Sequence, residues 1–303
     1  MLKNQNGELR SGWKIAFFTL AMFAIILAVS MVMFLFVIFI LMTQGKLHLN
    51  SLYDINSDFY QQMSTYGMYV QEIIMIIAPI FTWRIILKKP LSSMGLSGFI
   101  KNKTDFLSGL LFGIISITIV FLVIIASNQA EVVSWQPRFS PDLLTGLILF
   151  IFVGFAEEIY GRGFVISTLR QTRRYPVMIL VSSVLFSLMH SMNSGVGVLP
   201  YLNLFIAGML FAYMYIKSGT LWMCIGYHIT WNYFQGNIYG FNVSGIATKS
   251  IFTTVYQNDN LINGGKFGPE GGLIVTVILL LGFLFTKYYY RNKLIDFMAL
   301  EQS

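Results

Sequence analysis

The sequence contains few charged residues and a single cysteine, and each scarcity excludes a class of protein. Only 11% of its 303 residues are charged and 56% are hydrophobic, whereas a soluble domain has about 25% charged residues. Such a chain cannot cover a surface that faces water, so we predict an integral membrane protein. The lone Cys224 excludes an intramolecular disulfide framework and a CxxC metal site.

Apolar runs divide the chain into segments of membrane-spanning length. A transmembrane helix needs about 20 residues to cross the hydrocarbon core. The predicted spans are residues 14–43, 66–86, 105–127, 142–165, 176–190, 199–216, 220–236 and 271–290. The first run is too long for the apolar part of a signal peptide, which has about 7–15 residues. We therefore predict an all-α protein with about eight transmembrane helices.

The net charge of +7 reflects membrane topology and not nucleic-acid binding, because the basic residues flank the apolar runs. With the N-terminus inside, the outer segments contain only Lys46, Arg138, Lys249 and Lys266. The inner segments contain Lys3, Arg10, Lys88, Lys89, Lys101, Lys103, Arg170, Arg173, Arg174, Lys217, Arg291 and Lys293. This asymmetry predicts that both termini are cytoplasmic.

Three predicted spans contain polar groups that lipid would reject. Glu157, Glu158 and Arg162 lie in the span 142–165, whereas His190 and His228 lie in two later spans. A charged group at the bilayer centre costs at least about 2.5–3.5 kcal/mol, so such groups face the bundle interior and are usually functional. We expect these groups to converge on one site. His48 lies in a polar outer loop, and we assign it no role.

The spacing of these residues separates their roles. Glu158 precedes Arg162 by four residues, the favoured order for an intrahelical ion pair. Glu157 is rotated by about 100° from Glu158 on a helix, so the two carboxylates are expected to have different surroundings, as in an acid–base site. His228 and Asn232 share one helical face and together suit an oxyanion. Asn232 alone is equally consistent with a helix–helix hydrogen bond.

Depth along the spans gives a check on this convergence. At 1.5 Å per residue, the depths from the inner side are about 9 Å for Glu157, 14 Å for His228 and 20 Å for His190. Helix tilt of about 20° reduces the differences between these three depths. We expect the site in the inner half or the middle of the membrane, with His190 the least well placed.

Three motifs occur in order on separate hydrophobic segments. They are Glu157-Glu158-x-x-x-Arg162, Phe186-x-x-x-His190 and His228-x-x-x-Asn232. Together they resemble the CAAX protease and bacteriocin-processing family (CPBP or Abi), which includes the Ras-converting CAAX endopeptidase. The resemblance covers residues 142–236 and implies an intramembrane endopeptidase.

The resemblance also implies a role for each matched residue. Glu157 would be the general base that activates water, helped by His190, and Glu158 would pair with Arg162. His228 and Asn232 would stabilise the tetrahedral oxyanion. The implied reaction is hydrolysis of a peptide bond in a hydrophobic or membrane-anchored peptide, for peptide maturation, bacteriocin immunity or CAAX-type processing.

The resemblance implies no cofactor, and the chain has no HExxH zinc motif. Glu157, His190 and His228 would nevertheless supply the three protein ligands that a catalytic zinc needs, so a zinc site is the alternative. A cysteine protease is a further alternative, because Cys224 and His228 are four residues apart. A free cysteine is more commonly a small buried hydrophobe.

Two functions other than proteolysis compete with this interpretation. A non-enzymatic scaffold would position a partner membrane protein, with the polar segments 44–65 and 237–270 as partner surfaces. A proton-coupled transporter would use the glutamates and histidines as a relay. Transporters often contain repeated halves, and the sequence shows no internal repeat.

The expected organisation follows from these assignments. The four parts are a cytoplasmic tail (1–13), three N-terminal spans (14–141), a catalytic helical core (142–236), and an outer loop with the last span and tail (237–303). The expected location is a bacterial cell membrane, crossed several times. The expected partners are the lipid bilayer and a hydrophobic peptide or protein substrate, with no nucleic acid.

Overall fold

The protein is an all-α membrane protein, as predicted. A computed structural model describes residues 2–3, 7, 9–45 and 58–301. Lys46, His48 and most of the polar segment 44–65 lie outside the described residues. The helices are α1 (Ser11–Thr43), α2 (Asp58–Phe81), α3 (Phe99–Ala126), α4 (Asp142–Glu158), α5 (Ser167–Leu169), α6 (Tyr175–Met189), α7 (Val198–Ser218), α8 (Trp222–Tyr233) and α9 (Leu273–Tyr289).

Each predicted span coincides with one helical segment of the described chain. Three helices continue into π-helical turns, namely α2 into Thr82–Ile86, α4 into Ile159–Ile166 and α8 into Phe234–Ile238. Within the described ranges, five segments are long and apolar enough to cross a bilayer: Ser11–Thr43, Gln62–Ile86, Leu91–Ala126, Asp142–Thr172 and Val198–Ser218. The apolar helices α6 and α9 are shorter, and α8 is the most enclosed, since its residues from Met223 to Asn232 are all buried.

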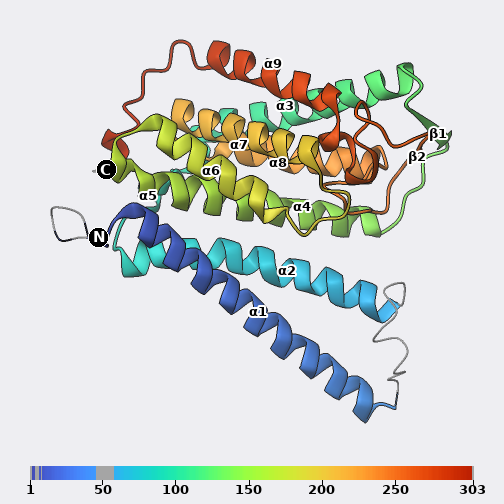
Figure 1. Cartoon of the computed structure of the whole chain (residues 1–303), viewed down its shortest axis with the longest axis horizontal. Coiled ribbons are helices and arrows are strands. Elements are labelled where there is room, and N and C mark those ends of the chain that lie inside the picture. Colours follow the sequence, from blue (N-terminus) through green and yellow to red (C-terminus); the bar gives the residue numbers. More distant parts are fainter. Residues whose placement is uncertain (1, 4–6, 8, 46–57, 302–303) are drawn as a thin grey trace.

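The chain passes back and forth between two ends of the bundle (Figure 1). Both labelled termini lie at one end, which we call the terminus end. At the other end, the ribbon end, β1 (Ala130–Ser134) pairs antiparallel with β2 (Thr253–Tyr256), with Ala130 opposite Tyr256. Strand β2 lies in the segment 237–270 that was predicted as an outer loop. The ribbon therefore fastens this long segment to the end of α3.

Glycines bring α3 and α8 into backbone contact at the centre of the bundle. A Cβ atom on Gly109 would lie 2.2 Å from the Met223 carbonyl oxygen, and one on Gly113 would lie 2.3 Å from Thr230 Oγ1. In return, a Cβ atom on Gly226 would lie 2.5 Å from the Phe106 carbonyl oxygen. Small residues of this kind allow close helix packing in membranes. The contact fixes α8, and with it His228, in the interior.

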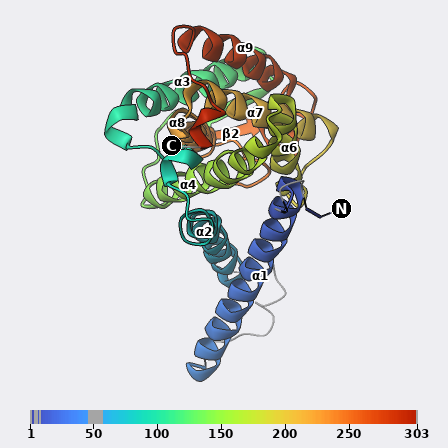
Figure 2. The same cartoon turned by 90° about the vertical axis from the view of Figure 1, so that its left-hand side faces the viewer.

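Helices α1 and α2 stand to one side of the other helices (Figures 1 and 2). Along α1 most apolar side chains are exposed, as expected for a helix surrounded by lipid. Near the terminus end α1 contacts the π-helical segment, where Thr19 and Tyr160 share a hydrogen bond of 2.8 Å. Helix α2 packs against α4, which places the middle of α2 beside the glutamate pair.

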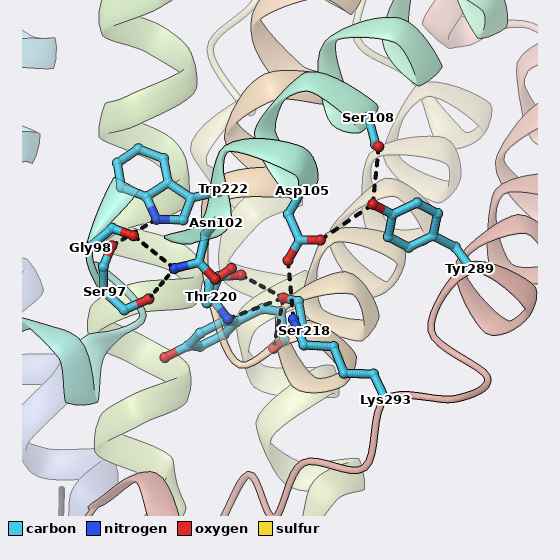
Figure 3. A network of polar contacts seen from close by, with 11 residues as sticks. Ser97, Gly98, Asn102, Asp105, Ser108, Ser218, Thr220, Trp222, Tyr289 and Lys293 are labelled. Carbon is cyan, nitrogen blue, oxygen red and sulfur yellow. Dashed lines mark hydrogen bonds and ion pairs between the residues drawn. The ribbon is translucent and has the colours of Figure 1, made fainter. Parts of the chain in front are cut away.

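The C-terminal tail is anchored to the terminus end by polar and aromatic contacts. Lys293 Nζ lies 3.2 Å from Asp105 Oδ2, and the Tyr289 hydroxyl lies 3.0 Å from that of Ser108 (Figure 3). Phe297 is fully buried, with the Arg170 guanidinium 4.3 Å from its ring centroid. These contacts tie the chain beyond α9 to α3 and to the helical turn after α5.

Candidate active site

A cavity of about 160 Å³ lies between the helices and collects polar residues from several of them. Glu157, His190, His228 and Asn232 all line it, so polar groups from three predicted spans do converge. The cavity has room for several water molecules.

The position of the cavity along the bundle differs in part from the expected one. Its wall includes Asn193, Ser244 and Glu270, which belong to ribbon-end loops. It therefore extends from the middle of the bundle towards the ribbon end, and not into the half that holds the termini. His190 caps the ribbon-side end of α6, which explains why its depth differed most from that of Glu157.

Glu158 is completely buried and has two basic partners. Its Oε1 atom accepts a hydrogen bond from Arg162 Nη1 at 3.1 Å and lies 2.9 Å from His228 Nδ1. The predicted pairing with Arg162 is therefore present. The contact with His228 was not predicted, because the two residues are 70 positions apart in the chain. Glu158 thus connects α4 to α8 and orients the His228 ring.

Arg162 is fully buried among aromatic rings. Its guanidinium lies 4.3 Å from the ring centroid of Phe186 and 5.0 Å from that of Phe211, distances at which cation–π attraction is strong. Its Nη2 atom lies 3.4 Å from the Gly208 carbonyl oxygen. The residue sits in the π-helical turn that follows α4, a local structure that is frequent at functional sites.

Glu157 lines the cavity and is not neutralised in this way. Its Oε2 atom is buried without a hydrogen-bond partner among the described residues. The adjacent glutamates therefore have different surroundings, as their spacing predicted. Glu158 is held by an arginine and a histidine, and Glu157 is left to interact with whatever occupies the cavity.

Both histidines have one ring nitrogen engaged by the protein. His190 Nδ1 lies 2.9 Å from the Phe186 carbonyl oxygen, and because a carbonyl only accepts, Nδ1 carries the hydrogen. His228 Nδ1 is held by Glu158, and its ring stacks on Phe211 at 5.3 Å. In both rings Nε2 is the nitrogen available to a ligand. Asn232 lies one turn beyond His228 on the cavity wall.

Glu72 of α2 is a buried carboxylate on the cavity wall that was not predicted. This residue is 4% exposed and lines the same cavity. Gln71 Nε2 donates to Glu72 Oε1 at 3.1 Å, whereas Glu72 Oε2 is buried without a partner. The criterion that selected Glu157, a carboxylate within an apolar run, applies equally to Glu72 in the run 66–86.

The residues do not form the alternative sites considered from the sequence. In the part of the chain that the structure describes, no three His, Cys, Asp or Glu side chains are grouped to hold a metal ion. The zinc set Glu157, His190 and His228 therefore does not fit as the side chains stand. Cys224 is buried outside the cavity wall and donates to the Leu221 carbonyl at 3.3 Å, so it forms no nucleophile–base pair with His228.

Comparison with known proteins supplies an independent assignment. Residues 139–234 match the family model described as type II CAAX prenyl endopeptidase Rce1-like. The match contains α4, α6, α7, α8 and all three motifs. No curated protein and no solved structure matches the chain. The matched family supports CAAX-type intramembrane protease activity in general, and residues 139–234 of this chain are similar to it, as their three motifs are to the CAAX protease family.

Proposed function

We propose that this protein is an intramembrane endopeptidase of the glutamic type, acting on a hydrophobic or membrane-anchored peptide in a bacterial cell membrane. One observation carries the proposal. Of two adjacent glutamates, Glu158 contacts Arg162 and His228 and does not line the cavity, whereas Glu157 lines the cavity together with His190 and Asn232 and has a buried Oε2 atom without a partner among the described residues.

The proposed reaction begins with a water molecule between Glu157 and the peptide carbonyl carbon. Glu157 accepts a proton from this water as the new C–O bond forms, and His190 Nε2 accepts its second hydrogen as a hydrogen bond. The carbonyl oxygen becomes an oxyanion. When the C–N bond breaks, Glu157 returns the proton to the leaving amine, so protons balance over the cycle.

The oxyanion requires hydrogen-bond donors, and α8 supplies two. The Asn232 amide donates from one side, and His228 donates from Nε2. Because His228 Nδ1 also donates to Glu158, the ring carries hydrogens on both nitrogens in this step. The Glu158 carboxylate is then the counter-ion for both His228 and Arg162.

The cavity wall supports an apolar substrate. Besides the polar groups it consists of side chains such as Met68, Phe150, Met189 and Trp231. Such a wall accepts apolar side chains of a peptide, while the few polar groups orient its backbone. A prenylated or otherwise lipid-anchored peptide is the substrate class that the family description favours.

The test compares membranes that contain the wild-type protein with membranes that contain Glu157→Gln at equal amounts. New peptide N-termini are labelled chemically and identified by mass spectrometry. The proposal expects termini that occur only with the wild type and are also absent from a His228→Ala variant. An identical set of termini in all three membranes would contradict proteolysis, and an unchanged cellular phenotype in both variants would favour the scaffold role.

A further inference from the structure

Glu72 lies outside the matched residues 139–234, so none of the three motifs accounts for it. It occupies the middle of α2, a helix that packs against α4. An ionisable side chain within a transmembrane helix is expensive to bury and by default indicates a function. Because Glu72 lines the same cavity as Glu157, we expect it to act in that cavity.

Glu72 and Glu157 each have a buried Oε2 atom without a hydrogen-bond partner among the described residues. Glu158 Oε2 is also buried without a partner, but Glu158 does not line the cavity, and its Oε1 atom contacts Arg162 and His228. Glu72 and Glu157 both line the cavity, and their charges would repel each other. A buried acceptor without a partner destabilises the fold. Two unpartnered carboxylates in one enclosed cavity are costlier still, unless a proton lies between them.

The other carboxyl and imidazole groups on or next to the cavity wall already have partners. Glu270 Oε2 accepts hydrogen bonds from the backbone N–H and the hydroxyl of Ser244. His190 is bonded to the Phe186 carbonyl, and His228 is bonded to Glu158. Glu158 is in turn compensated by Arg162. Glu72 and Glu157 are therefore the natural partners for each other.

The contact with Gln71 indicates which oxygen of Glu72 would carry a proton. A protonated carboxyl group has one accepting oxygen and one O–H donor. Gln71 Nε2 donates to Glu72 Oε1, which makes Oε1 the acceptor and leaves Oε2 for the hydrogen. Oε2 is also the atom without a partner.

We propose that Glu72 is a positioning residue that shares one proton with Glu157 across the cavity. Glu72 holds this proton on Oε2, so that Glu157 remains unprotonated and able to accept a proton from water. The inference rests on the proposed function, because it assigns Glu72 a role through the general base. No bond other than O–H forms or breaks in the exchange.

The first test observes the proton directly and needs no substrate. Infrared spectra of the protein in lipid vesicles at neutral pH report the C=O stretch of protonated carboxyl groups. We expect one such signal in the wild type, its loss in Glu72→Gln, and a shift of its frequency in Glu157→Gln. Glu131→Gln removes an exposed glutamate on β1 and is the matched control without effect. An identical signal in wild type and Glu72→Gln would overturn the proposal.

The second test uses a peptide that the wild type cleaves and Glu157→Gln does not. In Glu72→Gln no proton is shared, so the fall in rate at high pH that accompanies loss of the shared proton should disappear, while the fall at low pH remains. Glu72→Leu should lower the rate at least about tenfold at neutral pH, and Glu72→Asp should restore most of it.

The two tests separate this proposal from the proposed function. Lack of cleavage of any peptide would overturn the protease assignment, and the infrared signal would still decide whether the proton is shared. A pH profile of Glu72→Gln that keeps the wild-type fall at high pH, in a variant that folds and cleaves, would overturn proton sharing alone.

Discussion

At the scale of single residues, helix geometry explains why the identical side chains of Glu157 and Glu158 have different surroundings. A helix points adjacent side chains about 100° apart. One carboxylate therefore meets Arg162 and His228, and the other meets the cavity. The different surroundings of the two carboxylates come from geometry and not from residue type.

This difference predicts opposite effects on stability. Glu158→Ala leaves Arg162 and His228 buried without their carboxylate, so we expect a loss of about 3–5 kcal/mol in the free energy of unfolding. Glu157→Gln keeps the shape of the side chain in a polar cavity and should change stability by less than about 1 kcal/mol. Thermal unfolding in detergent, followed by tryptophan fluorescence, measures both. Equal destabilisation by the two substitutions would contradict the assigned roles.

The absence of a grouped set of metal ligands among the described residues leads to a second prediction. Peptide cleavage by the purified protein should be unaffected by a strong chelator, and added zinc should not increase it. The rate is measured before and after dialysis against the chelator, with a known zinc protease as a positive control. Loss of cleavage that zinc restores would show that the side chains rearrange to bind a metal.

The sequence permitted some of these residue contacts to be predicted and not others. Glu158 and Arg162 are four residues apart, so one helix determines their pairing. The Glu158–His228 contact depends on how α4 meets α8, which no local pattern specifies. Glu72 could have been predicted as a site residue, because the sequence shows that it is a carboxylate within the apolar run 66–86.

At the scale of helices, glycines decide which backbones approach each other. Glycine is common in membrane helices, so the glycines of the spans do not by themselves identify a helix contact. The structure separates them: Gly109, Gly113 and Gly226 lie at the α3–α8 contact, whereas a Cβ atom on Gly161 would meet nothing within 4 Å. Burial of α8, and therefore of His228, depends on the first three.

This contact predicts a selective effect of added methyl groups. Gly109→Ala places a Cβ atom 2.2 Å from a backbone carbonyl oxygen, which the helices relieve only by separating, at a cost of about 1–3 kcal/mol. Gly161→Ala is the matched control and should leave stability unchanged or slightly higher. Thermal unfolding in detergent gives both values, and the idea fails if Gly109→Ala unfolds at the wild-type temperature.

Helix bounds were largely predictable, whereas the ribbon was not. The spans 176–190 and 199–216 lie within one or two residues of α6 and α7, because polar or glycine-containing loops terminate their apolar runs. The ribbon pairs β1 with a strand more than 100 residues later. Its formation depends on the bundle bringing both segments to one end, which the short strands do not reveal.

At the scale of the whole molecule, the back-and-forth path places the predicted inner and outer loops at opposite ends. Arg173, Lys217 and Arg291 lie at the terminus end, and Arg138 and Lys249 lie beside the ribbon. The loops predicted as inner therefore lie at one end of the bundle, and the loops predicted as outer lie at the other end. The position of α1 and α2 to one side of the other helices was not predicted, because local hydropathy contains no information on how helices are arranged.

A labelling experiment tests the predicted orientation. Cys224 is buried, so it should not react with a membrane-impermeant maleimide. Gln136→Cys, an exposed position at the ribbon end, should be labelled on intact cells, and Asn292→Cys, an exposed position at the terminus end, only after permeabilisation. The reverse pattern would place both termini outside, and labelling of both positions on intact cells would contradict the eight-span path.

The anchored tail has a mechanical consequence for this path. Lys293 contacts Asp105 of α3, and Phe297 contacts Arg170 in the turn after α5. The tail therefore holds these two elements together at the terminus end of the bundle. We therefore expect the helix displacements that admit a peptide chain to be smallest near the tail.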